Sequence, residues 1–131
     1  MDDIVKEFLS ESFQTVEVLE SGVSRFESVE VEPDVVKAVF RGVHTIKGSC
    51  GFLGFSRLEA LTASGELLLG RLQSGRVQHS PAIAAALEEL VRAVREMLEG
   101  IKQSGLEVAD ERRELIARLD ALATVPEDTT H

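Results

Sequence analysis

Residues 80–105 read SPAIAAALEELVRAVREMLEGIKQSG, and this stretch decides the fold class. Its apolar residues recur every three or four positions, which is the period of an amphipathic helix. They are Ile83, Leu87, Leu90, Val91, Val94, Leu98 and Ile101. Ser80 can cap the first turn, Pro81 suits the first helical position, and Gly105 lies where the pattern stops. The stretch therefore predicts one long helix that ends near residue 102.

The same spacing recurs in four other segments. It predicts helices over residues 2–26, 33–48, 56–74 and 110–123. Residues 33–48 are rich in β-branched side chains, yet their helical spacing extends over about fourteen positions, which is longer than most strands. Because no segment alternates for long and the connections are short, the sequence predicts an all-α fold, an antiparallel up-down four-helix bundle with an additional C-terminal fifth helix.

A few residues are expected to mark helix ends. Ser56, followed three positions later by Glu59, predicts a capping box at the start of the third helix. Asp110 is expected to cap the fifth helix. The glycine-rich run 48–54 is expected to mark a kinked end of the second helix and a tight turn.

Composition excludes several classes of function. The chain has 131 residues, of which 44% are hydrophobic, so it is long enough for one globular domain with its own core. A net charge of −9 disfavours nucleic acid as a partner, because such a surface repels phosphate. One cysteine excludes a disulfide framework. With no long apolar run and no secretory leader, the sequence predicts a cytoplasmic protein that does not enter a membrane.

His44 is the candidate reactive residue. It projects about 100–120° from the apolar stripe near Val39 and Val43, so it is expected on the flank of the second helix and not in the core. Lys47 follows one turn later on the same face. Gly48 also follows one turn later, where it costs the helix about 1 kcal/mol relative to alanine. A surface kept clear for another protein would explain that cost, and simple helix termination is the alternative.

An exposed imidazole can act as a nucleophile, because its ordinary pKa of about 6.5 leaves the ring largely neutral near neutral pH. Attack through Nε2 requires the proton on Nδ1, and a carboxylate that accepts a hydrogen bond from Nδ1 fixes this tautomer. The next helix offers two acids, Glu59 and Glu66, and the capping box is expected to occupy Glu59. A nearby ammonium, such as that of Lys47, would stabilise an arriving phosphoryl group.

The remaining histidines and the cysteine are expected to have no reactive role. His79 is predicted to lie in a solvent-exposed loop, and His131 in the terminal tail. Cys50 falls on the apolar side of its helix, so it is predicted to be a small core residue and not a reactive thiol.

Residues 44–55, HTIKGSCGFLGF, resemble the histidine phosphotransfer (HPt) motif of CheA-type chemotaxis kinases. Residues 1–9, MDDIVKEFL, and residues 115–119, LIARL, are similar to the start and to the fifth helix of such domains. The resemblance extends from Met1 to about Ala123. It implies that His44 is the phosphoacceptor, that Glu66 orients the imidazole through Nδ1, and that Lys47 stabilises phosphoryl charge.

The resemblance also implies a docking surface and contains one departure. Gly48 matches the glycine that opens the surface, and with Thr45 and Ser49 it forms the predicted docking site for partner proteins. Many family members carry a second histidine one turn before the glutamate, where this chain has Ala63. The support of Glu66 is therefore expected to be weaker or to come from water.

By the same resemblance, the chain looks like the N-terminal domain of a larger histidine kinase. The domain would not be an enzyme on its own and would hold no cofactor or metal. The kinase domain of the parent, with ATP, would load His44, and His44 would pass the phosphoryl group to an aspartate in the receiver domain of a response regulator, which supplies Mg²⁺. Residues 1–125 would form the HPt domain, expected to be a monomer, and residues 126–131 the start of a linker or a disordered tail.

Three other functions are weighed against this one. The run 48–54 does not match a phosphate-binding loop, because its lysine precedes the glycine and no strand leads into it. His44 and Glu66 alone supply too few ligands for a metal site. The serious alternative is a non-catalytic helical adaptor, in which His44 and Lys47 are only surface residues.

Overall fold

The computed structural model describes residues 2–28 and 30–125, and helices dominate this part of the chain. The elements are α1 (Asp3–Ser24), the 3-10 turn η1 (Arg25–Glu27), α2 (Pro33–Leu53), α3 (Ser56–Gln73), α4 (Pro81–Ser104) and α5 (Arg113–Ala123). The linker or tail predicted for residues 126–131 lies outside the described residues.

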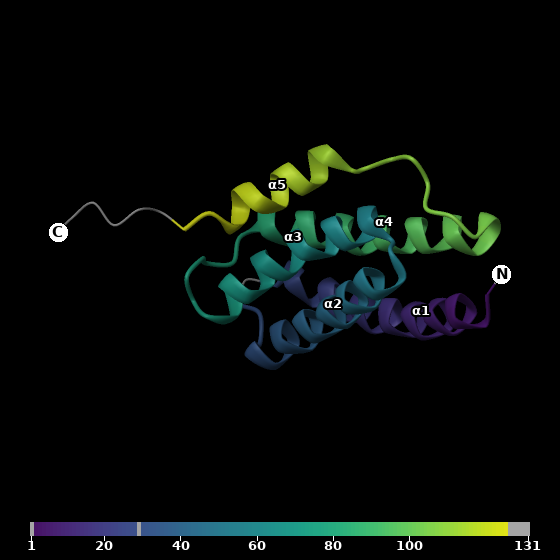
Figure 1. Cartoon of the computed structure of the whole chain (residues 1–131). Coiled ribbons are helices and arrows are strands. Elements are labelled where there is room, and N and C mark those ends of the chain that lie inside the picture. Colours follow the sequence, from purple (N-terminus) through teal and green to yellow (C-terminus); the bar gives the residue numbers. More distant parts are fainter. Residues whose placement is uncertain (1, 29, 126–131) are drawn as a thin grey trace.

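The helices form a closed bundle of four with the fifth laid across it. Helix α1 packs against α2 and α4, α2 packs against α3, and α3 packs against α4, while α5 covers α3 and α4 (Figure 1). The predicted all-α fold is therefore confirmed. The fully buried side chains include Leu19, Val39, Leu58, Leu61, Leu87, Leu90 and Leu98, all of which lie in predicted helices. Each such aliphatic side chain contributes about 1.5–3 kcal/mol by leaving water.

Helix α2 is longer than the sequence predicted. It continues past Gly48 to Leu53 and ends at Gly54, whose φ of 80° is the left-handed conformation that glycine adopts without strain. The stripe that holds it to the core continues as well, because Ile46 and Cys50 are both buried. Helix termination therefore does not explain Gly48, which lies inside the helix.

The predicted capping box is wrong. Ser56 is the first residue of α3 and makes no capping hydrogen bond. Instead the backbone amides of Arg57 and Leu58 donate to Glu107 Oε1 and Oε2, at 3.2 and 2.8 Å. Glu107 belongs to the connection between α4 and α5, so a carboxylate distant in sequence stabilises the N-terminus of α3.

Helix α5 begins three residues later than predicted. Asp110 does not cap it; its Oδ1 accepts a hydrogen bond from the backbone amide of Arg112, 2.9 Å away, which makes a turn ahead of the helix. Arg112 adopts a left-handed φ of 54°. At the other end, Arg71 Nη1 donates to the carbonyl of Ala123 at 2.6 Å and fastens α5 to α3.

Cys50 and His79 both contribute to the packing of the domain. Cys50 is fully buried, as predicted, and burial together with the charges of Glu107 and Glu59 raises the pKa of its thiol to about 12. His79 lies in the loop between α3 and α4, as predicted, but it is only partly exposed. Its Nε2 lies 2.6 Å from the carbonyl oxygen of Phe26, and its ring meets the Phe26 ring edge-on, so it joins the α3–α4 connection to η1.

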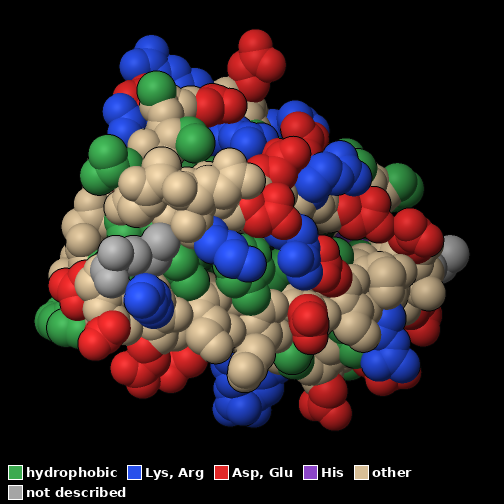
Figure 2. Space-filling view, turned by 90° about the vertical axis from the view of Figure 1, so that its right-hand side faces the viewer, with side chains coloured by type: hydrophobic (Ala, Val, Ile, Leu, Met, Phe, Trp, Pro, Cys, Tyr) green, Lys and Arg blue, Asp and Glu red, His purple; other side chains and the backbone are tan. Residues whose placement is uncertain are grey.

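Charged side chains of both signs cover the end of the molecule shown in Figure 2, where red and blue groups are interspersed. The excess of acidic residues is therefore not gathered into one field on that face. None of the described helices is long and apolar enough to cross a membrane.

Candidate functional site

His44 projects from the flank of α2, as its position in the helical period predicts. Its neighbours Val43 and Ile46 are buried in the core. The imidazole itself points away from the core, and the His44 side chain is 64% exposed. A partner protein can therefore reach the ring without any opening of the bundle.

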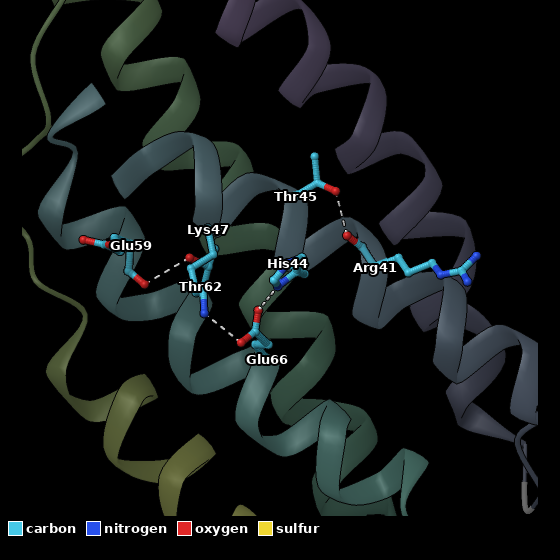
Figure 3. A network of polar contacts seen from close by, with 7 residues as sticks. All are labelled: Arg41, His44, Thr45, Lys47, Glu59, Thr62 and Glu66. Carbon is cyan, nitrogen blue, oxygen red and sulfur yellow. Dashed lines mark hydrogen bonds and ion pairs between the residues drawn. The ribbon is translucent and has the colours of Figure 1, made fainter. Parts of the chain in front are cut away.

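Helix α3 supplies a carboxylate to the imidazole. Glu66 Oε2 lies 2.6 Å from His44 Nδ1, because the antiparallel packing of α2 and α3 brings the two residues to the same level (Figure 3). Burial alone would raise the pKa of Glu66, but hydrogen bonds from Lys47 and His44 and the charges of these groups lower it below 4.5. An ionised carboxylate only accepts hydrogen bonds, so Nδ1 carries the proton and Nε2 keeps its lone pair.

Lys47 supports the other oxygen of the same carboxylate. Its Nζ lies 2.7 Å from Glu66 Oε1 (Figure 3). In the absence of a second histidine, support for Glu66 was expected to be weaker or to come from water, and the structure adds this contact with Lys47. Ala63 is exposed on α3. The second contact with Glu66 comes from a lysine on α2. The two oxygens of Glu66 thus bind one donor each, both from the helix that carries the phosphoacceptor candidate.

The three predicted docking residues lie around His44 on α2. Thr45 is exposed, and its hydroxyl donates to the carbonyl of Arg41 at 2.9 Å. Gly48 is exposed, and a Cβ added there would meet no atom within 4 Å. Ser49 is half-buried at the edge facing α1. Among residues 2–28 and 30–125, no packing contact requires a glycine at position 48.

A shallow groove beside Gly48 was not predicted from the sequence. It measures about 310 Å³ and lies between α1 and α2, with walls that include Ile4, Phe8, Gly48 and Phe52. Phe52 is 83% exposed and Ile4 is 55% exposed, which is unusual for large apolar side chains. The signal was present in the spacing, because Phe52 follows His44 by eight residues, with Gly48 midway between them.

Replacing Gly48 with alanine tests whether the surroundings of this position are open. We expect the free energy of unfolding of the variant to be about 0.5–1 kcal/mol higher than that of the wild type, because alanine is the better helix former and meets no clash. Urea denaturation measures this gain. A loss of stability would contradict the open surroundings of Gly48.

A metal centre has no support in this part of the molecule. Among residues 2–28 and 30–125 there is no group of three or more histidine, cysteine, aspartate or glutamate side chains placed to hold an ion. The contacts of Glu66 with His44 and Lys47 bring together an imidazole, a carboxylate and an ammonium, which is the composition of an oriented nucleophile.

The model of the Hpt domain family matches residues 3–124. The chain belongs to the Hpt domain family. The match includes all five helices as well as His44, Lys47 and Glu66, so the site lies within the part of the chain that the family shares. The family suggested by residues 44–55 is therefore confirmed.

Proteins with similar sequences include chemotaxis proteins and a sensor histidine kinase. This Hpt domain is 32% identical to chemotaxis protein CheA of Treponema pallidum, and the match covers 95% of the chain and 16% of that protein. It is 27% identical to sensor histidine kinase CheAY of Helicobacter pylori, again over 95% of the chain and 16% of that protein. The chain thus spans about one sixth of the length of these relatives.

A solved structure has the same fold. The phosphorylated P1 domain of CheA3, determined in complex with CheY6 from R. sphaeroides, matches this Hpt domain with a TM-score of 0.86 and 26% identity. The match covers 94% of this chain and 97% of that one. The similarity therefore extends to the complete bundle and not to one helix pair.

Proposed function

We propose that this Hpt domain carries a phosphoryl group between two proteins of a chemotaxis-type signalling pathway. A kinase domain loads the γ-phosphoryl group of ATP onto Nε2 of His44, and a receiver domain of a response regulator then removes it. The observation that carries the proposal is one exposed imidazole whose Nδ1 is held by an ionised carboxylate, 2.6 Å away. A site of this kind in a CheA-like domain favours a phosphoacceptor over a passive adaptor.

The chemistry follows from the tautomer. The Nε2 lone pair forms the bond to phosphorus while the bond between the γ-phosphorus and the bridging oxygen of ATP breaks, and ADP leaves with that electron pair. In the second step a carboxylate oxygen of the receiver attacks phosphorus, and the electron pair of the N–P bond returns to Nε2. The proton on Nδ1 stays in place during both steps. Glu66 accepts its hydrogen bond and stabilises the positive charge that the ring gains as the N–P bond forms.

Lys47 contributes to the same electrostatics. Through its 2.7 Å contact it keeps Glu66 ionised and correctly turned. Its positive charge, one helical turn from His44, also stabilises the phosphoryl group. The domain itself supplies only the acceptor. ATP binding belongs to the kinase domain and Mg²⁺ to the response regulator, and we place the exchange in the cytoplasm, where ATP is available.

We propose that the groove beside Gly48 takes part in docking the receiver domain. Phe52 follows His44 by eight residues on α2, which places the two exposed side chains about 80° apart around the helix axis. The missing side chain at Gly48 leaves a low surface between them. A partner that reaches Nε2 of His44 can therefore cover Phe52 at the same time. Burial of an exposed aromatic side chain is a common source of binding energy in protein interfaces.

Replacing Phe52 with alanine tests this docking surface. We expect the KM for the receiver domain to rise about tenfold, because truncating an aromatic anchor costs more than about 1 kcal/mol. Unfolding should not change, since the side chain is 83% exposed. Val18→Ala is the matched control, because Val18 is an apolar side chain on α1 that is 57% exposed and does not line the groove. Equal KM values for the Phe52 variant and the wild type would contradict the role of the groove.

The proposed function as a whole is tested by a two-step transfer assay. The domain is incubated with the kinase domain and ATP labelled at the γ-phosphate, freed of ATP, and then mixed with the receiver domain. We expect a label on the domain that is lost in acid and survives base, and that moves to the receiver within the second step. A domain that takes up no label, or that keeps it when the receiver is added, would support the adaptor instead.

A further inference from the structure

Phe40 lies one helical turn before His44 on α2, and its ring stacks on the imidazole. The two ring planes are parallel to within 8°, and their centroids are 6.2 Å apart. Aromatic rings attract each other in offset parallel arrangements at such separations. The imidazole therefore has two fixed neighbours, Glu66 at Nδ1 and Phe40 along the helix.

Phe40 is itself held by both helices of the site. It is partly buried against the hydrophobic core. Across the helix pair, a Cβ added at Gly70 would lie 3.4 Å from Phe40 Cε2, so the ring lies close to the backbone of α3. Gly70 follows Glu66 by one turn on α3, and Phe40 precedes His44 by one turn on α2. Because these helices are antiparallel, Phe40 and Gly70 form the layer next to the layer of His44 and Glu66.

We propose that Phe40 is a positioning residue for the phosphoacceptor. A single hydrogen bond to Glu66 fixes the direction of Nδ1 but leaves the imidazole able to tilt about that bond. The stacked ring of Phe40, supported by α3 at Gly70, sets the plane of the imidazole. Nδ1 then stays on the carboxylate and Nε2 points away from the bundle. Holding a nucleophile in its reactive orientation is a direct contribution to rate. The inference rests on the proposed function of His44.

Two substitutions of Phe40 and one matched control test the proposal. Phe40→Leu keeps an apolar side chain but removes the aromatic face, and Phe40→Tyr restores that face. Phe13→Leu is the control, because Phe13 is also a partly buried ring but lies on α1, where Arg95 and Lys102 approach it at 5.9 and 5.8 Å. For each variant, thermal unfolding gives the stability, and steady-state assays with the domain as substrate give kcat and KM for phosphoryl uptake from the kinase domain. Nitrogen NMR of the histidine rings, at a slightly alkaline pH where imidazole is neutral, reports the tautomer.

We expect Phe40→Leu to lower kcat for uptake about two- to tenfold, the range expected for loss of an aromatic pair, with little change in KM. Its His44 nitrogen signals should move toward the average of the two tautomers, and the Nδ1 proton should exchange faster with water. Phe40→Tyr should match the wild type in both measurements. Phe13→Leu should lose stability without changing kcat for phosphoryl uptake or the nitrogen signals of His44.

The proposal is overturned if Phe40→Leu keeps wild-type nitrogen signals and kcat, if Phe40→Tyr is as impaired as Phe40→Leu, or if Phe13→Leu shows the same changes. The NMR measurement does not depend on phosphoryl transfer. If the wild-type domain takes up no phosphoryl group, the proposed function fails, and the nitrogen signals still decide whether Phe40 positions the ring.

Discussion

Replacing His44 with glutamine is expected to abolish phosphoryl uptake from ATP and the kinase domain. Glutamine has a similar reach, but the lone pair of its amide nitrogen is delocalised and cannot attack phosphorus. The side chain is 64% exposed, so the change should alter the free energy of unfolding by no more than about 0.5 kcal/mol. Glu66 keeps its contact with Lys47 in the variant, which preserves the packing of α2 on α3. Incorporation of label from γ-labelled ATP, together with a circular dichroism melt, measures both expectations.

His79→Gln is the matched control for that experiment. His79 contacts the carbonyl of Phe26 and has no part in the site, so this variant should take up label like the wild type even if its melting temperature falls. Label that persists in His44→Gln would refute the assignment of the phosphoacceptor. Label that disappears only in His79→Gln would move the reactive residue to the α3–α4 connection.

Replacing Glu66 with glutamine is expected to slow phosphoryl uptake about ten- to hundredfold, by analogy with the loss caused by removing a carboxylate that orients a metal-bound histidine. The neutral amide cannot stabilise the positive charge that the ring gains during transfer, and it no longer dictates which ring nitrogen holds the proton. Glu59→Gln is the matched control, because Glu59 lies on the same helix but touches neither His44 nor Lys47 in the described contacts. If the two variants take up label equally fast, Glu66 does not orient the imidazole.

The same substitution has a defined dependence on pH. The pKa of Glu66 is lower in the folded domain than its ordinary value of 4.5, so the folded state favours the ionised form. The stability that this group contributes is therefore fully present above the unfolded-state pKa and is lost as the pH falls through the lower, folded value. Urea denaturation should show the wild type more stable than Glu66→Gln at neutral pH, with the difference in free energy of unfolding shrinking as the pH falls below 4.5. A difference that grows in acid would contradict the lowered pKa.

The fold was predictable because each helix is encoded locally. The apolar period of α4, for example, places Leu87, Leu90 and Leu98 on one face without any knowledge of what covers them. The same period placed His44 on the flank of α2, and counting acids on the next helix limited the orienting carboxylate to two residues. These are inferences across one or two turns of a helix, which the sequence determines directly.

Contacts between distant residues were not predictable in the same way. Glu107 stabilises the start of α3 from about fifty positions away, and no pattern near Ser56 indicates it. Lys47 turned out to hold Glu66 as well as to flank His44, because the approach of two helices decides which ammonium meets which carboxylate. Phe52 was missed since an apolar residue in a helix is usually assigned to the core, and because the predicted second helix ended at residue 48 while α2 continues to Leu53.

The central claim is that the phosphoryl group resides on His44, and locating the group on the protein tests it most directly. The domain is incubated with the kinase domain and ATP, digested under alkaline conditions, and its peptides are fragmented in a mass spectrometer with and without a prior addition of the receiver domain. We expect one phosphorylated peptide, with the group on His44 itself, and loss of that species when the receiver is present. A group found on Thr45 or Ser49, or one that the receiver does not remove, would contradict the account.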